Sequence, residues 1–172
     1  DLIADGGNIT LAGRVVNQEG LVQANTVGER NGKIALYASE LLTLKTGSQI
    51  RARGGMDGVS DGGTILAVAD KSKGSANFEQ GAVLDVSGGA QGGHGGFVEL
   101  SGYHVKLGGR FLGDVRAGYR GGRLLIDPVD VDLSDLSASS GFSTITFSSP
   151  DDLRVTGSFD MDALSPPPDG EG

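Results

Sequence analysis

Short segments in which apolar and polar residues alternate recur along the chain, and each begins directly after a glycine pair or an Asn-Gly pair. Alternation with a period of two is typical of a β-strand with one buried face. The segments recur every 25 to 33 residues, so that their apolar positions fall into two columns. The first column holds Ile9, Ile34, Ile65, Val98 and Leu124, and the second holds Leu11, Leu36, Ala67, Leu100 and Ile126. The pattern predicts one equivalent strand in each repeat.

Each repeat carries further apolar positions after these columns. A later column has an apolar residue, a polar residue and a second apolar or small residue in succession. It begins at Val22, Ile50, Leu84 and Val115, continues at Gln23, Arg51, Asp85 and Arg116, and ends at Ala24, Ala52, Val86 and Ala117. A middle patch between the columns is formed by Leu42, Leu44, Phe78, Val105 and Leu107. Because side chains alternate across a strand, the polar members are expected to face solvent.

Three short strands per repeat cannot each bury a face alone, whereas stacking one repeat on the next buries all three around a shared interior. Crossovers between parallel strands are right-handed as a rule. The sequence therefore predicts an all-β chain folded as a right-handed parallel β-helix, a β-solenoid with three short strands per coil. An antiparallel sandwich also has many short strands, but it gives no reason for the same columns to repeat.

Composition favours strands over helices and excludes several kinds of site. Glycine supplies 31 of the 172 residues, which disfavours long helices, since each interior glycine costs a helix about 1 kcal/mol. The chain has no cysteine, which excludes disulfides, thiolate metal sites and a cysteine nucleophile. The formal net charge of −8, concentrated in the acidic stretch after residue 126, argues against nucleic acid as a partner.

The repeats also define the domain organisation. Residues 1–135 are predicted to form the β-helix coils, and residues 136–164 irregular β coils or a capping segment with strand-like alternation at 143–147 and 153–157. Residues 165–172 are predicted to be a Pro-rich linker, because proline cannot donate to a sheet ladder. The chain starts in mid-pattern and without methionine, so we expect it to be a piece of a longer protein.

Several runs of sequence are similar to those of a known family. They lie within about residues 5–135 and include NGKIALYASELLTLKTGSQIRARGG, GGTILAVAD, GGFVELSG and GGRLLIDPVDV. The chain resembles the filamentous-haemagglutinin family of two-partner secretion exoproteins, which are large bacterial surface and secreted adhesins. The resemblance implies a right-handed parallel β-helix in the shaft of an adhesin that is exported through a dedicated outer-membrane transporter. The Asn-Pro-containing strands of the family's secretion domain are missing from this sequence, so we expect the segment to lie downstream of that domain.

Few residues carry a chemical signature, and no catalytic or cofactor-binding residue is predicted. Asp130 and Asp132 alternate with apolar residues, and we interpret them as one solvated strand face. They are also weak candidates for a calcium site, since hard cations prefer carboxylate oxygens. Paired aspartates occur in polysaccharide-cleaving enzymes as well, but no matching column of acids precedes this pair. His94 and His104 are interpreted as a turn residue and an outward strand residue rather than metal ligands.

Two functions from different classes follow from these observations. The first is a structural and adhesive shaft segment, without enzymatic activity or cofactor, secreted by or held at the surface of a Gram-negative bacterium and acting in attachment or in a biofilm matrix. Its expected partners are the outer-membrane transporter of the full-length protein and extracellular polysaccharide or a host or bacterial cell surface. Outward Arg51, Arg53 and Arg116 are the candidate surface contacts.

The alternative is a β-helical carbohydrate-binding or carbohydrate-cleaving domain, which a cleft with convergent carboxylates would favour. The resemblance also leaves open the stalk of a contact-dependent toxin or of a haem-acquisition exoprotein, because these proteins use the same scaffold.

Overall fold

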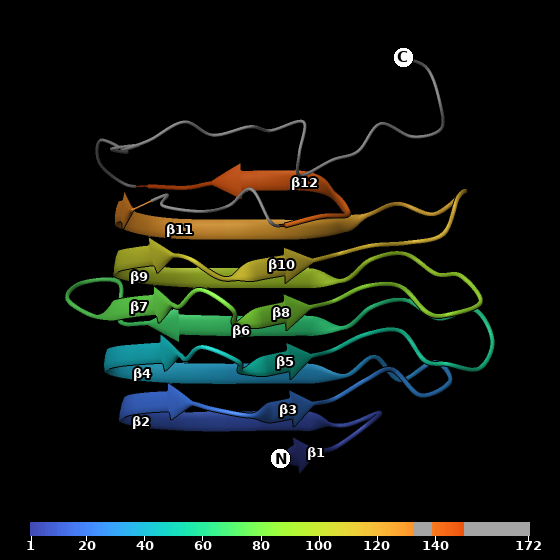
Figure 1. Cartoon of the computed structure of the whole chain (residues 1–172), viewed down its shortest axis with the longest axis horizontal. Helices are drawn as coiled ribbons and strands as arrows, with labels where there is room; N and C mark the ends of the chain where they lie inside the picture. Colours follow the sequence, from blue (N-terminus) through green and yellow to red (C-terminus); the bar gives the residue numbers. More distant parts are fainter. Residues whose placement is uncertain (133–138, 150–172) are drawn as a thin grey trace.

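Strands and connecting loops make up the described part of the chain (Figure 1). The computed structural model describes residues 1–132 and 139–149. In chain order the strands are β1 (Leu2–Ile3), β2 (Asn8–Gln18), β3 (Leu21–Gln23), β4 (Lys33–Leu44), β5 (Gln49–Arg51), β6 (Thr64–Ala69), β7 (Ser75–Phe78), β8 (Val83–Asp85), β9 (Phe97–Leu107), β10 (Arg110–Leu112), β11 (Gly122–Asp132) and β12 (Phe142–Phe147). The prediction of an all-β chain is confirmed. No helix long and apolar enough to span a membrane occurs among these residues.

The strands form two sheets, and every pairing between named strands is parallel. The five-stranded sheet has the order β1-β3-β5-β8-β10. The seven-stranded sheet has the order β12-β11-β9-β6-β4-β2, with β7 paired to β4 and β9. The chain alternates between the two sheets: after passing through the larger sheet it forms a short strand of the smaller sheet and then returns to the larger one. We call each such passage a round. Successive rounds lie one above another in Figure 1.

Strand register confirms the first two predicted columns. In the first, Ile9 pairs with Ile34, Ile34 with Ile65, Ile65 with Val98, and Val98 with Leu124. The second column pairs in the same order, two residues further along each strand. The central members of the first column have no exposed surface. Burying each such side chain stabilises the fold by roughly 1.5–3 kcal/mol, so the columns form the hydrophobic core.

The middle apolar patch belongs to a longer strand in most of the described rounds. Strands β2, β4, β9 and β11 have 11 or 12 residues and continue from the first columns through the patch. One described round instead has the two separate strands predicted, β6 and β7. A tight turn separates them, in which Asp70 Oδ1 accepts a hydrogen bond from the backbone N of Ser72 (2.7 Å) and Asp70 O accepts one from Gly74 N (2.7 Å).

The later column pairs as predicted from β3 through β5 to β8 and departs from the prediction in the next round. Leu84 pairs with Phe111 in β10 rather than with Val115. Phe111 is completely buried, and its ring meets that of Phe78 edge to face with 4.8 Å between the centroids. Val115 is only half-buried and Ala117 is exposed, because the strand ends before them. The larger aromatic side chain takes the core position.

Glycines occupy the corner at which each round enters the larger sheet. The backbone N of Thr64 donates to Gly32 O at 3.0 Å, and that of Phe97 donates to Gly63 O at 2.9 Å. A Cβ atom on Gly63 would lie 2.1 Å from Gly32 O, and one on Gly96 would lie 2.0 Å from Gly63 O. Backbones of successive rounds therefore approach too closely here for any side chain, and we call this stack the glycine corner.

Strand β12 adds a further parallel strand beyond β11, with a register shift between Gly122 and Arg123. It covers residues 143–147, where the alternation predicts a strand. The predicted domain boundary at residue 135, the strand at 153–157 and the linker at 165–172 lie outside the described residues.

Candidate functional site

A column of polar residues continues each strand of the five-stranded sheet. Two residues beyond the strand ends, the rounds remain hydrogen-bonded to one another through four backbone bonds of 2.7 to 2.9 Å. The carbonyls of Asn25, Arg53, Ser87 and Asp114 accept these bonds. Together with Asp5, which precedes Asn25 in the stack, we call these residues the polar column. They come from successive rounds and thus lie side by side despite their separation in sequence.

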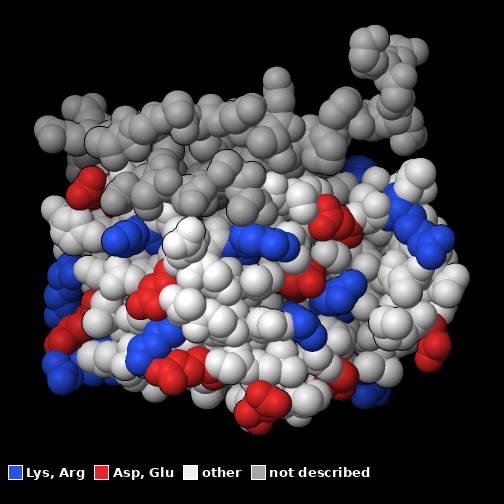
Figure 2. All heavy atoms as spheres, viewed as in Figure 1, with Lys and Arg blue, Asp and Glu red and all other residues white. Residues whose placement is uncertain are grey.

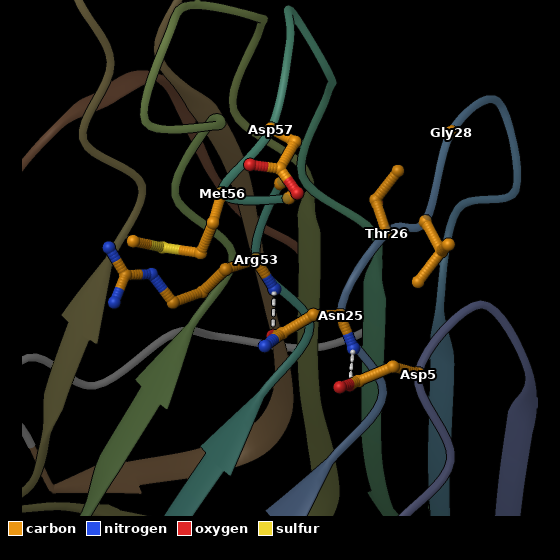
Figure 3. Close-up of a pocket in the computed structure, with 10 residues that line it drawn as sticks. Asp5, Asn25, Thr26, Gly28, Arg53, Met56 and Asp57 are labelled. Carbon is orange, nitrogen blue, oxygen red and sulfur yellow. Dashed lines mark hydrogen bonds between the residues drawn. The ribbon is translucent and has the colours of Figure 1, made fainter.

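Side chains of the polar column are held by hydrogen bonds to the neighbouring round. Asp5 Oδ1 accepts from the backbone N of Asn25 at 2.8 Å, and Asn25 Oδ1 accepts from the backbone N of Arg53 at 3.0 Å (Figure 3). Gln23 Nε2 also donates to Asp5 Oδ1 at 3.1 Å. Short Asp and Asn side chains commonly bond to nearby backbone in this way. The backbone of the column is therefore fixed from one round to the next.

The first of two hollows along this column has a volume of about 210 Å³. Asp5, Asn25 and Arg53 line it together with Met56 and Asp57, which follow Arg53 in the loop after β5. In Figure 3 the Arg53 side chain points away from Asn25 and lies beside Met56. Met56 is 75% exposed, so its thioether forms an apolar surface next to the guanidinium.

The second hollow has a volume of about 360 Å³ and concentrates charged groups. Arg53, Asp85, Ser87, Asp114 and Arg116 are among its lining residues. Because Arg53 lines both hollows, the two adjoin, and we call them together the polar groove. The groove runs along the polar column and hence across the strands.

Asp85 is a buried carboxylate in the second hollow, although the sequence predicts it to face solvent like Gln23 and Arg51. Its side chain is 8% exposed. Asp85 Oδ1 accepts hydrogen bonds from the backbone N (3.0 Å) and Oγ (2.6 Å) of Ser87, and Asp85 Oδ2 lies 3.4 Å from Nε of Arg53. A buried charge is costly unless it is paired and hydrogen-bonded, and these groups satisfy that need. The Asp-x-Ser spacing was the signal in the sequence that could have indicated this arrangement.

The structure brings together two of the three arginines predicted as surface contacts. Arg53 and Arg116 are exposed and line the second hollow. The Arg116 guanidinium has no hydrogen bond or ion pair with the rest of the described chain. Arg51 lines neither hollow, and it is half-buried and donates to Oε1 of Gln49. The sequence thus predicted two residues of the groove and missed its aspartates.

The acidic strand face is placed elsewhere, on β11. Asp130 is exposed and pairs in register with His104, whose Nδ1 lies 3.1 Å from Asp130 Oδ2. Asp132 pairs in register with Lys106, and its side chain lies outside the described part. Within residues 1–132 and 139–149, no group of three or more His, Asp or Glu side chains is arranged to hold a metal ion.

His94 connects the glycine-rich loops of three rounds. Its backbone N donates to Asp61 Oδ1 at 2.7 Å, and its Nδ1 accepts from the backbone N of Arg120 at 2.9 Å. Its ring also lies edge-on to Tyr119, with 5.5 Å between the centroids. These contacts give His94 a structural role between rounds. It is half-buried and lies in the segment between the turn at residues 90–91 and β9, rather than in the turn itself as predicted.

Lys71 forms an ion-pair network on another part of the surface. Its Nζ lies 2.5 Å from Asp127 Oδ2 and 3.5 Å from Glu99 Oε1, and these acids belong to the next two strands of the sheet. The hydrogen bond to Asp127 is the main cause that raises the pKa of Lys71 above its usual value. This network connects neighbouring rounds but lies apart from the polar groove.

Comparison of the chain with protein-family models, with curated proteins and with solved structures finds no match.

Proposed function

We propose that the chain is a segment of right-handed parallel β-helix that forms part of the structural and adhesive shaft of a large secreted adhesin. The observation that supports this proposal best is the parallel, in-register stacking of like residues through successive rounds. Each round in such a stack contacts mainly its neighbours, so the stack lengthens by adding rounds without a larger core. This property suits a spacer that holds contact surfaces away from a cell.

The arrangement of the strands supports three sides per coil. The long strands curl back at one end (Figure 1), so each can supply two sides, while the five-stranded sheet supplies the third. The separate strands β6 and β7 represent the same two sides in the round where a tight turn divides them. The right-handed sense follows from the general preference of parallel crossovers.

The sequence runs that resemble two-partner secretion exoproteins support the rest of the proposal. We infer secretion through an outer-membrane transporter and a place outside a Gram-negative cell, in attachment or in a biofilm matrix. On the face shown in Figure 2, basic and acidic side chains are interspersed, with no large area of one sign. A surface of this kind fits many weak contacts to polysaccharide or to a cell surface better than strong binding of a polyanion.

Deletion of residues 1–132 from the full-length protein in its own bacterium tests this function. We expect export to continue, because the secretion domain lies elsewhere, and attachment of cells under flow to weaken. The measurements are the amount of adhesin outside the cell and the number of attached cells. Unchanged attachment with normal export would contradict the proposal.

The polar groove favours carbohydrate binding as a second candidate function. Its second hollow also holds two carboxylates, Asp85 and Asp114, and paired carboxylates are the catalytic groups of glycoside-cleaving enzymes. Asp85 is buried and bonded to Ser87 and Arg53, and Asp114 Oδ2 accepts from Ser140 Oγ at 3.0 Å. These bonds support binding rather than cleavage. A depolymerisation assay on acidic and neutral polysaccharides tests this, and turnover that Asp114→Asn abolishes would favour the enzyme.

A further inference from the structure

We propose that the polar groove binds a linear polysaccharide with widely spaced carboxylates, such as one uronate in each repeating unit, and that Arg53 and Arg116 contact a carboxylate of this chain. The inference deepens the proposed surface function and rests on it. It names the chemical class of the ligand, the residues that recognise it and the direction in which it lies.

The two arginines are suited to a carboxylate because one is held in position and the other is free. Arg53 is oriented by the buried Asp85, whose second oxygen is occupied by Ser87. The side chain of Arg53 is still 46% exposed, which leaves guanidinium N–H groups for a ligand. Arg116 lines the same hollow and has no ion pair within the described chain. A planar guanidinium binds a carboxylate through two parallel hydrogen bonds, which gives both strength and orientation.

The groove also presents acceptors, which distinguishes a sugar from a dense polyanion. Asp5, Asp57 and Asp114 line the two hollows beside the arginines. Ionised carboxylates only accept hydrogen bonds, so they fit the hydroxyl groups of a sugar and repel closely spaced negative charges. A polymer rich in hydroxyls with sparse carboxylates satisfies both kinds of group. An acidic peptide or a heavily sulfated chain would place charges against these aspartates.

The geometry of the column indicates how the polymer lies. The hollows share Arg53 and follow a column of one residue from each round, from Asp5 to Asp114. With neighbouring strands about 4.8 Å apart, four such steps span about 19 Å. The polysaccharide is therefore expected to run across the strands and parallel to the stack. Apolar surface from Met56 in the first hollow and Val115 in the second lies beside the charged groups and can pack against the C–H faces of sugar rings.

Binding of hyaluronan octasaccharide to the 172-residue chain tests the inference, because this probe alternates a uronate with a neutral sugar. Titration calorimetry or NMR line shifts on the wild type and on Arg116→Gln, Arg53→Gln and Arg110→Gln give the affinities. We expect the first two variants to bind about tenfold more weakly, as for loss of a charge-assisted hydrogen bond, and the third within about twofold. Arg110 is an exposed arginine of β10 that does not line the second hollow, so it controls for net charge.

Control probes separate the carboxylate from other sources of affinity. Carboxyl-reduced hyaluronan should lose most of the binding, and polyglutamate and heparin should bind more weakly than hyaluronan. Thermal melts identify any variant that loses affinity by unfolding. Arg53→Gln leaves Asp85 without its cation, so Arg116→Gln, whose side chain has no such partner, gives the decisive affinity.

Three results would overturn the inference: no binding at millimolar probe, equal loss in Arg110→Gln, or tighter binding of heparin or polyglutamate. The same variants in the full-length adhesin separate this inference from the proposed function. Failure to bind the probe together with attachment that still depends on the segment would reject the groove as a binding site and leave the shaft function standing. Attachment that is independent of the whole segment would reject the shaft function.

Discussion

Truncating Ile50 to alanine measures the contribution of one core column to the stability of the stack. Ile50 lies in β5, has no exposed surface, and is paired in register with Val22 on one side and Leu84 on the other. The substitution removes three carbon atoms, which at about 0.8 kcal/mol each amounts to about 2.4 kcal/mol of lost hydrophobic transfer. Neighbouring backbones are held by ladder hydrogen bonds and cannot collapse fully into the space. A cavity term therefore adds to the loss, for a total of about 3–4 kcal/mol.

The matched control is Arg51→Ala, one residue further along the same strand. Arg51 points away from the core column and donates to Gln49, so its removal should cost less than about 1 kcal/mol. Urea unfolding followed by far-UV circular dichroism gives both values from the shift in midpoint. Ile50→Asp should be more damaging than Ile50→Ala, because it buries a charge without a partner. Equal destabilisation by Ile50→Ala and Arg51→Ala would refute the assignment of the column.

Three further experiments test the corner, the ion-pair network and the acidic strand. Gly63→Ala should destabilise the fold by about 3 kcal/mol or more through overpacking against the preceding round. The control Gly28→Ala, at a residue with positive φ but open space around it, should cost only about 1–2 kcal/mol. Equal melting temperatures of the two variants would contradict this. The acidic partners of Lys71 raise its pKa in the folded protein. The stability contributed by these ion pairs is therefore fully present below the unfolded pKa of lysine, about 10.4, and is lost as the pH rises through the higher folded pKa. Lys71→Met should therefore flatten the alkaline loss of stability, while costing less than about 1 kcal/mol at neutral pH, and an unchanged alkaline profile would contradict it. Millimolar calcium should leave the melting temperature unchanged if Asp130 and Asp132 form only a solvated face. A calcium site would instead raise it, because calcium at a hundred times its Kd stabilises the folded state by about 2.7 kcal/mol.

The stacked columns could be predicted because every round must place the same kind of residue at the same position along its strand. Ile34, Ile65 and Val98 have like neighbours above and below, so the repeat in the sequence directly reflects register. The last member of the later column could not be found in this way. Val115 matched the apolar-polar-small pattern, but Phe111 occupies the register position beside Leu84. Spacing alone does not reveal where the glycine-rich loop after β10 begins. The larger Phe111 ring fills the core position that the pattern assigned to Val115.

The polar groove was only partly predictable, since its residues become neighbours through the order of the rounds. The alternation of residues placed Arg53 and Arg116 on the outer surface, and both are exposed, although Arg116 lies in the loop after β10 rather than in the strand predicted. It also placed Asp85 there, but alternation assigns a side of the sheet and does not say what covers that side. Ser87 and Arg53 from nearby chain segments enclose the carboxylate. Burial of this kind depends on tertiary contacts that a pattern of period two does not contain.

The glycine corner has a consequence for how such a chain can change during evolution. The lengths of successive repeats differ, yet the rounds return to corners at Gly32, Gly63 and Gly96 where a Cβ atom has no room. An insertion that shifts such a glycine would put a side chain against neighbouring backbone. Loops such as the one around Met56 are exposed instead and can lengthen freely. Unequal recombination between two corners would duplicate or remove a complete round with both junctions already compatible. The corner thus defines the unit that can be duplicated or deleted in the gene. The loops between corners are the regions in which surface residues can change without disturbing the core.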